Sequence, residues 1–361
     1  MHLRLIRTLT ATLTLSVALF GALAFAQSAD FDVASGKVVT SSRPAAESYP
    51  DGDGLKLTDG AYAFSWADMV GFEGTEPVTL TVDLGAVYDT ISYVALKVMR
   101  SDGSAVGLPT AIVSVSEDGL LWEDLGLANV ALEGVIANDT VGTLVWADEA
   151  WAGYGQFVRV ELLPTSGWAM VAELQVGNGS IPVDRFPVGS VNAPTTAEAV
   201  NVSLGKSYSL QPAASEAYPD PDGTKLTDGS YAYAWGDMVG IADATFNPVV
   251  VIDLGEHVDG ITRVAGLFMR SFASAVNLPY SILVSVSDDG ENFQIVGLAA
   301  KTAPSPAMNE LINSVYWQDL QEPVGGRYVK LQVRQRTGWL MLAEVVVQTG
   351  AADPEVQEAA E

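Results

Sequence analysis

The residues of this chain that could do chemistry are aromatic, acidic and basic side chains that occur in two matching sets. Aromatic rings can stack on the C–H face of a sugar, and the planar groups of arginine and aspartate can hold its hydroxyls. The candidate ligand-binding residues are Tyr49, Asp68, Arg100 and Trp168, with Tyr218, Asp237, Arg270 and Trp339. A structural interpretation competes, because each tryptophan is in phase with the apolar face of a strand and each arginine could pair with an acid.

Two further features of these segments favour structural interpretations. Trp66 and Trp235 are predicted to be core side chains. The pairs Asp51-x-Asp53-Gly54 and Asp220-x-Asp222-Gly223 resemble the start of a calcium loop, with two acids before a glycine. The distal glutamate of a full calcium loop is missing at the required spacing, so an ordinary acidic turn is favoured.

Both sets belong to a repeated block. Residues 49–71 and 218–240 share Tyr-Pro-Asp, Lys-Leu-Thr-Asp-Gly, Trp and Asp-Met-Val-Gly at identical spacings and a constant offset of 169 residues. Later landmarks repeat with an offset that rises to 171, so the insertions fall in loops. The chain therefore holds two copies of one module.

Composition excludes several classes of function. The 361 residues are 48% hydrophobic, enough for two cores, and 18 basic against 44 acidic residues give a net charge of -26. Such a surface repels nucleic acid phosphates, so no nucleic acid partner is expected. The absence of cysteine excludes disulfides and thiolate metal sites, and only two histidines argue against most hydrolase mechanisms, though not against paired carboxylates.

The first 26 residues have the pattern of a secretory signal peptide. Arg4 and Arg7 precede an apolar stretch, and Ala24-Phe25-Ala26 fits a cleavage site before Gln27. We therefore expect a secreted or extracytoplasmic protein with no transmembrane segment after cleavage. An uncleaved membrane anchor is the alternative, since the stretch is barely long enough to span a bilayer.

The remaining chain predicts an all-β fold of two tandem jelly-roll β-sandwiches, at residues 30–177 and 200–348. Short segments rich in Val, Leu, Ile, Thr and aromatics alternate with Gly and Asp turns, without a convincing helical period. Residues 178–199, with three prolines, are predicted to be a semi-stiff linker, and residues 349–361 a disordered acidic tail. In the last strand of the first module, alternation predicts that the side chains at 168, 170, 172, 174 and 176 share one face.

The order of motifs in the second module resembles a known superfamily. Leu226-Thr227-Asp228-Gly229 is followed by Trp235, Val251 to Gly255, Ser287 to Gly290, Arg327 to Val329, and Gly338-Trp339. This series is similar to that of the discoidin, or coagulation factor 5/8 type C, superfamily of galactose-binding-like β-sandwiches, which includes family 32 carbohydrate-binding modules. The resemblance covers both modules, although the first one starts Ala34-Ser35-Gly36-Lys37, without the usual asparagine.

The resemblance implies one structural Ca2+ in each module. The matching carboxylates are those of Asp59 and Glu173 in the first module and Asp228 and Glu344 in the second. The matching carbonyls belong to Lys56, Ala172, Lys225 and Ala343. The alternative is that each aspartate caps its own Asp-Gly turn and each glutamate is solvated.

The resemblance also implies a non-enzymatic protein that binds extracellular or cell-surface carbohydrate or glycoconjugate through its loops. Two sites on one chain would gain by avidity. Two alternatives remain open: an adhesion or scaffold protein that binds another extracellular or envelope protein, and a glycoside-active enzyme. The enzyme is the weaker of the two, because the two modules leave no room for a catalytic domain.

Overall fold

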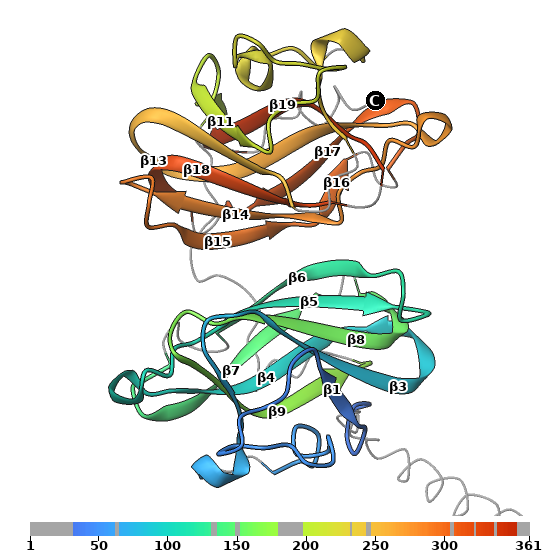
Figure 1. The fold of residues 1–361 in the computed structure, drawn as a ribbon, viewed down its shortest axis with the longest axis vertical. Coiled ribbons are helices and arrows are strands. Elements are labelled where there is room, and N and C mark those ends of the chain that lie inside the picture. The colour runs from blue at the N-terminus through green and yellow to red at the C-terminus, as the bar shows by residue number, and fades with distance from the viewer. Residues whose placement is uncertain are drawn as a thin grey trace, which may run out of the picture.

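The computed structural model is all-β, as the sequence predicts (Figure 1). It describes residues 32–351 except 62–64, 131–135, 149–151, 180–197, 232, 243–246, 304–306, 321–322 and 336–337. The predicted signal peptide therefore lies outside the described residues, as do most of the linker and the acidic tail. Helical segments in the described part are five 3₁₀ turns of three residues each. None of them has the length or apolar character that a bilayer crossing requires.

The described part of the first module contains nine strands and two 3₁₀ turns. The strands are β1 (Val39–Ser41), β2 (Val70–Glu73), β3 (Val78–Ile91), β4 (Tyr93–Arg100), β5 (Thr110–Ser116), β6 (Glu123–Val130), β7 (Thr140–Ala147), β8 (Gly153–Leu163) and β9 (Trp168–Gly177). The 3₁₀ turns are η1 (Trp66–Asp68) and η2 (Asp102–Ser104).

The second module repeats this order in ten strands. They are β10 (Val200–Asn201), β11 (Ser207–Gln211), β12 (Val239–Ile241), β13 (Val249–Arg270), β14 (Ser281–Ser287), β15 (Gln294–Ala299), β16 (Lys301–Ala303), β17 (Leu311–Gln318), β18 (Val324–Arg334) and β19 (Leu340–Thr349). Its 3₁₀ turns are η3 (Lys225–Thr227), η4 (Trp235–Asp237) and η5 (Phe272–Ser274).

Each sheet curls on itself to form the two layers of a sandwich. In the first module the strand order is β1-β3-β8-β5-β6-β7-β4-β9-β2, with antiparallel pairing throughout. The single long strand β13 of the second module spans both layers and takes the places of β3 and β4. One apolar cluster fills each sandwich, and its Val, Leu and Ile side chains come from alternate positions of these strands.

The last strand of each module contains a β-bulge that overturns one prediction. Lys97 pairs with Glu173 and Val98 with Val171, so Ala172 is skipped by the ladder, and Ala343 is skipped in the same way. Trp168, Met170 and Ala172 consequently pack in a small outer cluster. Leu174 and Val176 pack in the main core. The prediction that these five side chains share one face is wrong, because an extra residue shifts the alternation by one.

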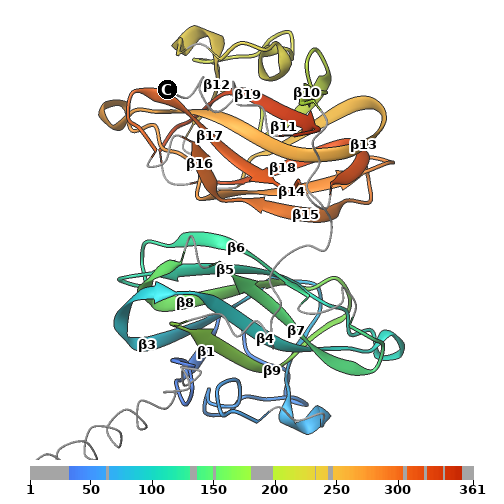
Figure 2. The ribbon, with the colours of Figure 1, turned by 180° about the vertical axis from the view of Figure 1, so that it is seen from behind.

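The two modules pack face to face through equivalent strands, with β5 and β6 against β14 and β15 (Figures 1 and 2). The apolar centre of this contact joins Ile112 with Leu283 and Leu127 with Leu298. The members of each pair stand 171 residues apart and occupy the same position in the two copies. The interface is therefore pseudo-twofold, like that of a symmetric dimer made within one chain.

A buried acid breaks this pseudo-symmetry. Asp124 accepts hydrogen bonds from Ser114 Oγ and from Ser281 Oγ across the interface, both at 2.6 Å. Its carboxylate also lies 2.9 Å from Arg334 Nε, and Arg334 Nη1 lies 2.7 Å from Glu161 Oε2. At the equivalent positions the chain carries Ile295 and Leu163, which pack in the apolar cluster. One side of the interface is thus ionic and the other apolar.

We expect Asp124→Ala to destabilise the protein by roughly 3 kcal/mol, because the partly buried Arg334 loses the carboxylate with which it pairs. The measurement is the thermal unfolding midpoint of the mature chain. Asp102→Ala, which removes an exposed ion pair with Arg100, is the matched control and should change it far less.

The double variant Asp124→Ile with Arg334→Leu copies the apolar pair of the other side. It should recover most of the lost stability, since well-packed apolar residues often replace a buried ion pair without cost. A midpoint for Asp124→Ala equal to that of the parent would contradict the proposed role of this acid.

Candidate functional site

Three aromatic side chains line a shallow pocket at the loop end of the first module. Tyr49 lies between Trp66 and Trp168, with ring centroids 6.0 Å and 5.7 Å apart, and it meets Trp168 edge-on at 89°. Ser104 and Val106 complete the described lining of this cavity of about 360 Å³. All three rings are half-buried, so each packs on the outer apolar cluster and still presents a surface to solvent.

The second module repeats this pocket. Tyr218 lies 5.7 Å from Trp235 and 5.6 Å from Trp339, again edge-on to the second tryptophan, at 88°. Ala217 and Ser274 complete the described lining of a cavity of about 540 Å³. The same geometry in both copies shows that the repeated block at 49–71 and 218–240 encodes a concave aromatic surface.

Backbone contacts fix the tyrosine in each pocket. Gly71 donates its N–H to Tyr49 O at 3.0 Å, and a Cβ at Gly71 would lie 2.9 Å from the tyrosine Cβ. Only glycine therefore lets the ring approach strand β2. Lys56 Nζ donates to Pro50 O at 2.7 Å and to Ala67 O at 3.2 Å, which ties the two halves of the loop together.

The structure brings together four of the eight predicted ligand residues. Tyr49 with Trp168, and Tyr218 with Trp339, line the two aromatic pockets. Asp68 and Asp237 are exposed at the ends of η1 and η4 and line neither pocket. The two arginines also lie elsewhere.

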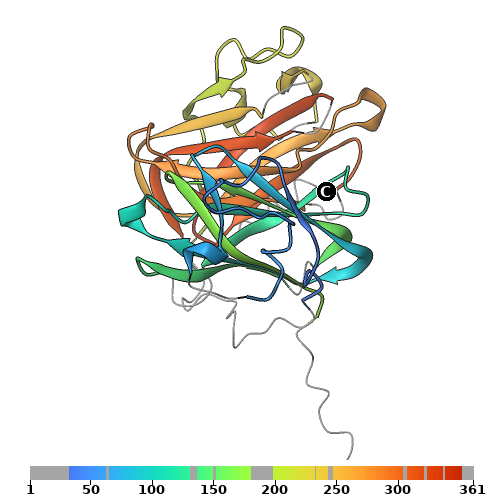
Figure 3. The ribbon, with the colours of Figure 1, turned by 60° about the horizontal axis from the view of Figure 1, so that its bottom comes forward.

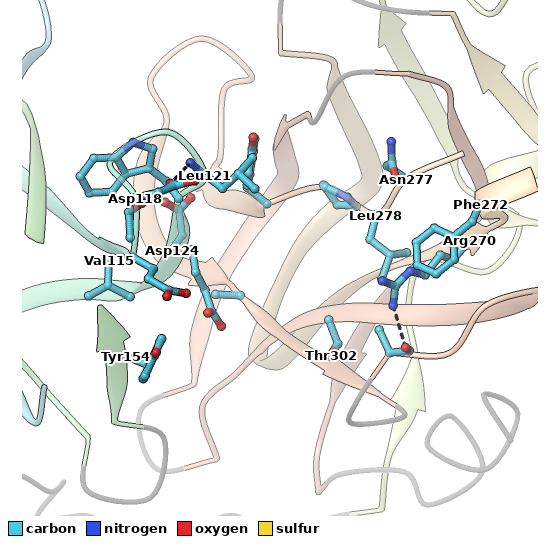
Figure 4. A pocket seen from close by; sticks show the side chains of 18 residues that line it. Val115, Asp118, Leu121, Asp124, Tyr154, Arg270, Phe272, Asn277, Leu278 and Thr302 are labelled. Carbon is cyan, nitrogen blue, oxygen red and sulfur yellow. Dashed lines mark hydrogen bonds between the residues drawn. The ribbon is translucent and has the colours of Figure 1, made fainter. Parts of the chain in front are cut away.

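Arg100 and Arg270 have different surroundings although they are equivalent in sequence. Arg100 pairs with Asp102 at 3.0 Å, as the structural interpretation expected. Arg270 has Phe272 in place of that acid, and its guanidinium lies 4.4 Å from the ring centroid. It lines a cleft between the modules rather than the aromatic pocket (Figure 4).

The prediction that Trp66 and Trp235 are core side chains is wrong. Both are half-buried and form one wall of their pocket. Each tryptophan has polar neighbours in the sequence, which are Ser65 and Asp68 in the first copy. These neighbours indicate a position at the surface.

The predicted cation site has a fully buried carboxylate at its centre. Glu173 is inaccessible to solvent, and its Oε1 accepts the Gly60 N–H at 3.1 Å. Its Oε2 has no hydrogen-bond partner among the described residues. Burial raises the pKa of Glu173 to about 8, the Gly60 N–H opposes this rise, and the nearby acids Asp59 and Asp32 add to it.

Glu344 repeats these properties in the second module. Gly229 donates to its Oε1 at 3.2 Å, Oε2 again lacks a partner, and burial raises the pKa of Glu344 to about 8. A buried carboxylate beside another acid is costly unless a proton or a cation neutralises it. The bulge residues Ala172 and Ala343 directly precede these glutamates and are skipped in the pairing of the last strand with β4 or with β13. The residues present therefore fit a hard cation such as Ca2+.

Other acids are accounted for by local structure. Asp59 and Asp228 also cap their own turns, since each accepts the N–H two residues later at 2.7 Å. Asp51 and Asp53 accept the backbone N–H groups of Lys56 and Leu55, which agrees with an acidic turn. No group of three or more acids or histidines suited to a metal occurs in the described part of the chain.

Solved structures that match this chain include lectins, carbohydrate-binding modules and a chain with an M60 catalytic domain. A fucolectin from Morone saxatilis (striped bass) serum matches at 17% identity over 89% of this chain and 99% of that one, with a TM-score of 0.32. A module from Clostridium perfringens, in complex with GalNAc-β-1,3-galactose, matches at 18% identity over 39% and 95%, with a TM-score of 0.31. A Streptococcus pneumoniae fucose-binding module matches at 17% identity over 42% and 96%, with a TM-score of 0.29. No family model and no curated protein matches the chain.

Proposed function

We propose that this chain is a secreted, non-catalytic protein that binds one sugar unit of a glycan in each aromatic pocket. The observation that carries the proposal is the recurrence of the same three-ring pocket in both modules. A wall of tyrosine and tryptophan offers an apolar face to the C–H surface of a sugar, and Ser104 or Ser274 offers a hydroxyl at the edge. Secretion rests on the signal-peptide pattern of residues 1–26.

The lining of the pockets favours binding over glycoside hydrolysis. Hydrolysis in most families needs two carboxyl groups that flank the scissile bond. The described residues that line the two pockets are aromatic, aliphatic or serine, and none is acidic. The enzyme alternative therefore finds no support at these two sites.

The sugar proposal is tested with the mature chain on a glycan array, followed by calorimetric titration of the best sugar. We expect two sites per chain. Trp168→Ala should remove one of them and Trp339→Ala the other, because truncation of a central aromatic costs roughly 2 kcal/mol, about thirtyfold in Kd. Trp168→Phe keeps an aromatic face and should retain most of the affinity.

Two results would refute the sugar proposal. One is a glycan array without a hit that free sugar displaces. The other is a sugar whose titration is unchanged in the double variant Trp168→Ala with Trp339→Ala.

We further propose that each module holds one Ca2+, bound by the carboxylates of Asp59 and Glu173 or of Asp228 and Glu344 with loop and bulge carbonyls. The cation would neutralise the buried glutamate and tie the loop that bears Tyr49 to strand β9. Support comes from the partnerless Oε2 atoms and from the two bulges. The role is structural, and no chemical step depends on the ion.

Calcium should raise the unfolding midpoint of the mature chain above its value in EDTA. The gain is expected to fall by about half in Glu173→Gln and to vanish when Glu344→Gln is added. In EDTA these variants should match or exceed the parent, because an uncharged amide is easier to bury than a carboxylate. A parent midpoint that is the same in calcium and in EDTA would contradict this proposal, whereas the sugar titration would remain a separate test.

A further inference from the structure

A cavity of about 630 Å³ lies between the modules (Figure 4). One wall comes from the turn between β5 and β6 and from Tyr154 of β8. The other comes from Arg270 at the end of β13 and from the segment between β13 and β14, which carries Phe272. Figure 3 shows the molecule with the first module in front of the second. We call this cavity the inter-module cleft.

Exposed apolar side chains gather on both walls of the cleft. Leu121 is 68% exposed, Phe272 60% and Tyr154 49%. Leu278 and Pro279 add buried apolar surface to the wall from the second module. Large exposed apolar side chains that cluster at one concave place are typical of an interaction site.

None of these three side chains is repeated at the equivalent position of the other module. The equivalents of Leu121, Tyr154 and Phe272 are Asn292, Gly325 and Asp102.

Pseudo-symmetry would give the interface two similar rims, one on each side. The apolar residues are present on one rim only. Packing between the modules does not need them, because all three remain about half or more exposed in the folded chain. The two copies have therefore diverged at the residues that face this cavity.

Arg270 is the cationic group of the cleft. Its Nη1 donates to Ala307 O at 2.7 Å, and its guanidinium stacks on Phe272. It makes no ion pair among the described residues, whereas the equivalent Arg100 is neutralised by Asp102. Nε and Nη2 of Arg270 have no hydrogen-bond partner among the described residues, and a guanidinium binds a carboxylate with two hydrogen bonds.

The facing wall has the opposite charge. Glu117 and Glu123 are exposed there, and Asp118 turns back to accept N–H groups of Leu120 and Leu121. The described residues that line this wall include no lysine or arginine, and Arg159 stacks on the lining residue Trp122. The cleft thus has an acidic side, an apolar floor and a single basic group on its far side.

We propose that the inter-module cleft binds an extended peptide segment of a partner protein. The segment would place a carboxylate on Arg270, an apolar side chain between Leu121 and Phe272, and a lysine or arginine toward Glu117 and Glu123. Charge complementarity favours a peptide over a neutral sugar, because the acidic wall and the Arg270 guanidinium suit a segment that carries both a basic and an acidic group. This site is separate from the aromatic pockets, and the inference does not depend on the sugar proposal.

The test is a random dodecapeptide library displayed on phage and panned on the mature full-length chain. We expect enriched sequences that combine an acidic, an apolar and a basic residue. A synthetic peptide of the enriched sequence should bind Phe272→Asp at least tenfold more weakly, because this variant restores the acid of the other copy beside Arg270. Leu121→Asn should weaken it similarly, and Glu117→Lys with Glu123→Lys should remove the preference for a basic residue.

Asn292→Ala changes the equivalent of Leu121 in the other copy and is the matched control, for which affinity should be unchanged. Unfolding midpoints show that each variant is folded. The proposal is overturned if panning enriches no sequence, if the peptide binds Phe272→Asp and Leu121→Asn as tightly as the parent, or if Phe272→Asp loses a sugar instead.

Discussion

A fully buried glutamate in the last strand of each module holds the loop that carries the aromatic pocket. In the first module, Glu173 receives the Gly60 N–H, and the next residue donates its N–H to Leu57 O at 2.6 Å. Residues 42–61 and 65–69 form no strand of the sheet, and these bonds help to hold them to the sandwich, together with the bracing by Lys56 and the bond from Gly71 N–H to Tyr49 O. The loop that bears Tyr49 is therefore tied in part to an acid that is costly to bury in its charged form without a partner.

The bulge explains how strand β9 contributes side chains both to the main core and to the support of the aromatic pocket. The extra residue at 172 lets Leu174 and Val176 fill the main core while Met170 supports Trp168 and Tyr49 from below. The same shift turns the glutamate toward the loop. Because the second module has the same bulge before Glu344, this arrangement belongs to the module rather than to one copy.

The two copies differ at the interface but not in the rings of the pockets. The pockets have kept the same three rings in both copies. The interface has an apolar centre with contributions from both copies. On one side of it, Asp124 and Arg334 stand where the other side has an apolar pair. Exposed apolar side chains lie on one rim only. This pattern is consistent with two equal terminal sites and one unique site between them.

The sequence by itself determined the all-β fold, the two copies and four of the pocket residues, because strand alternation, Asp-Gly turns and repeated spacing are local properties of the chain. It misassigned Trp66, since a single side chain in a loop carries no periodic signal that separates core from pocket wall. The bulge at Ala172 was equally hidden, as a register shift is set by the partner strand. The pairing of Arg100 with Asp102 is local, but only the tertiary structure decided that Arg270 faces a cleft, because the cleft forms where the two modules meet.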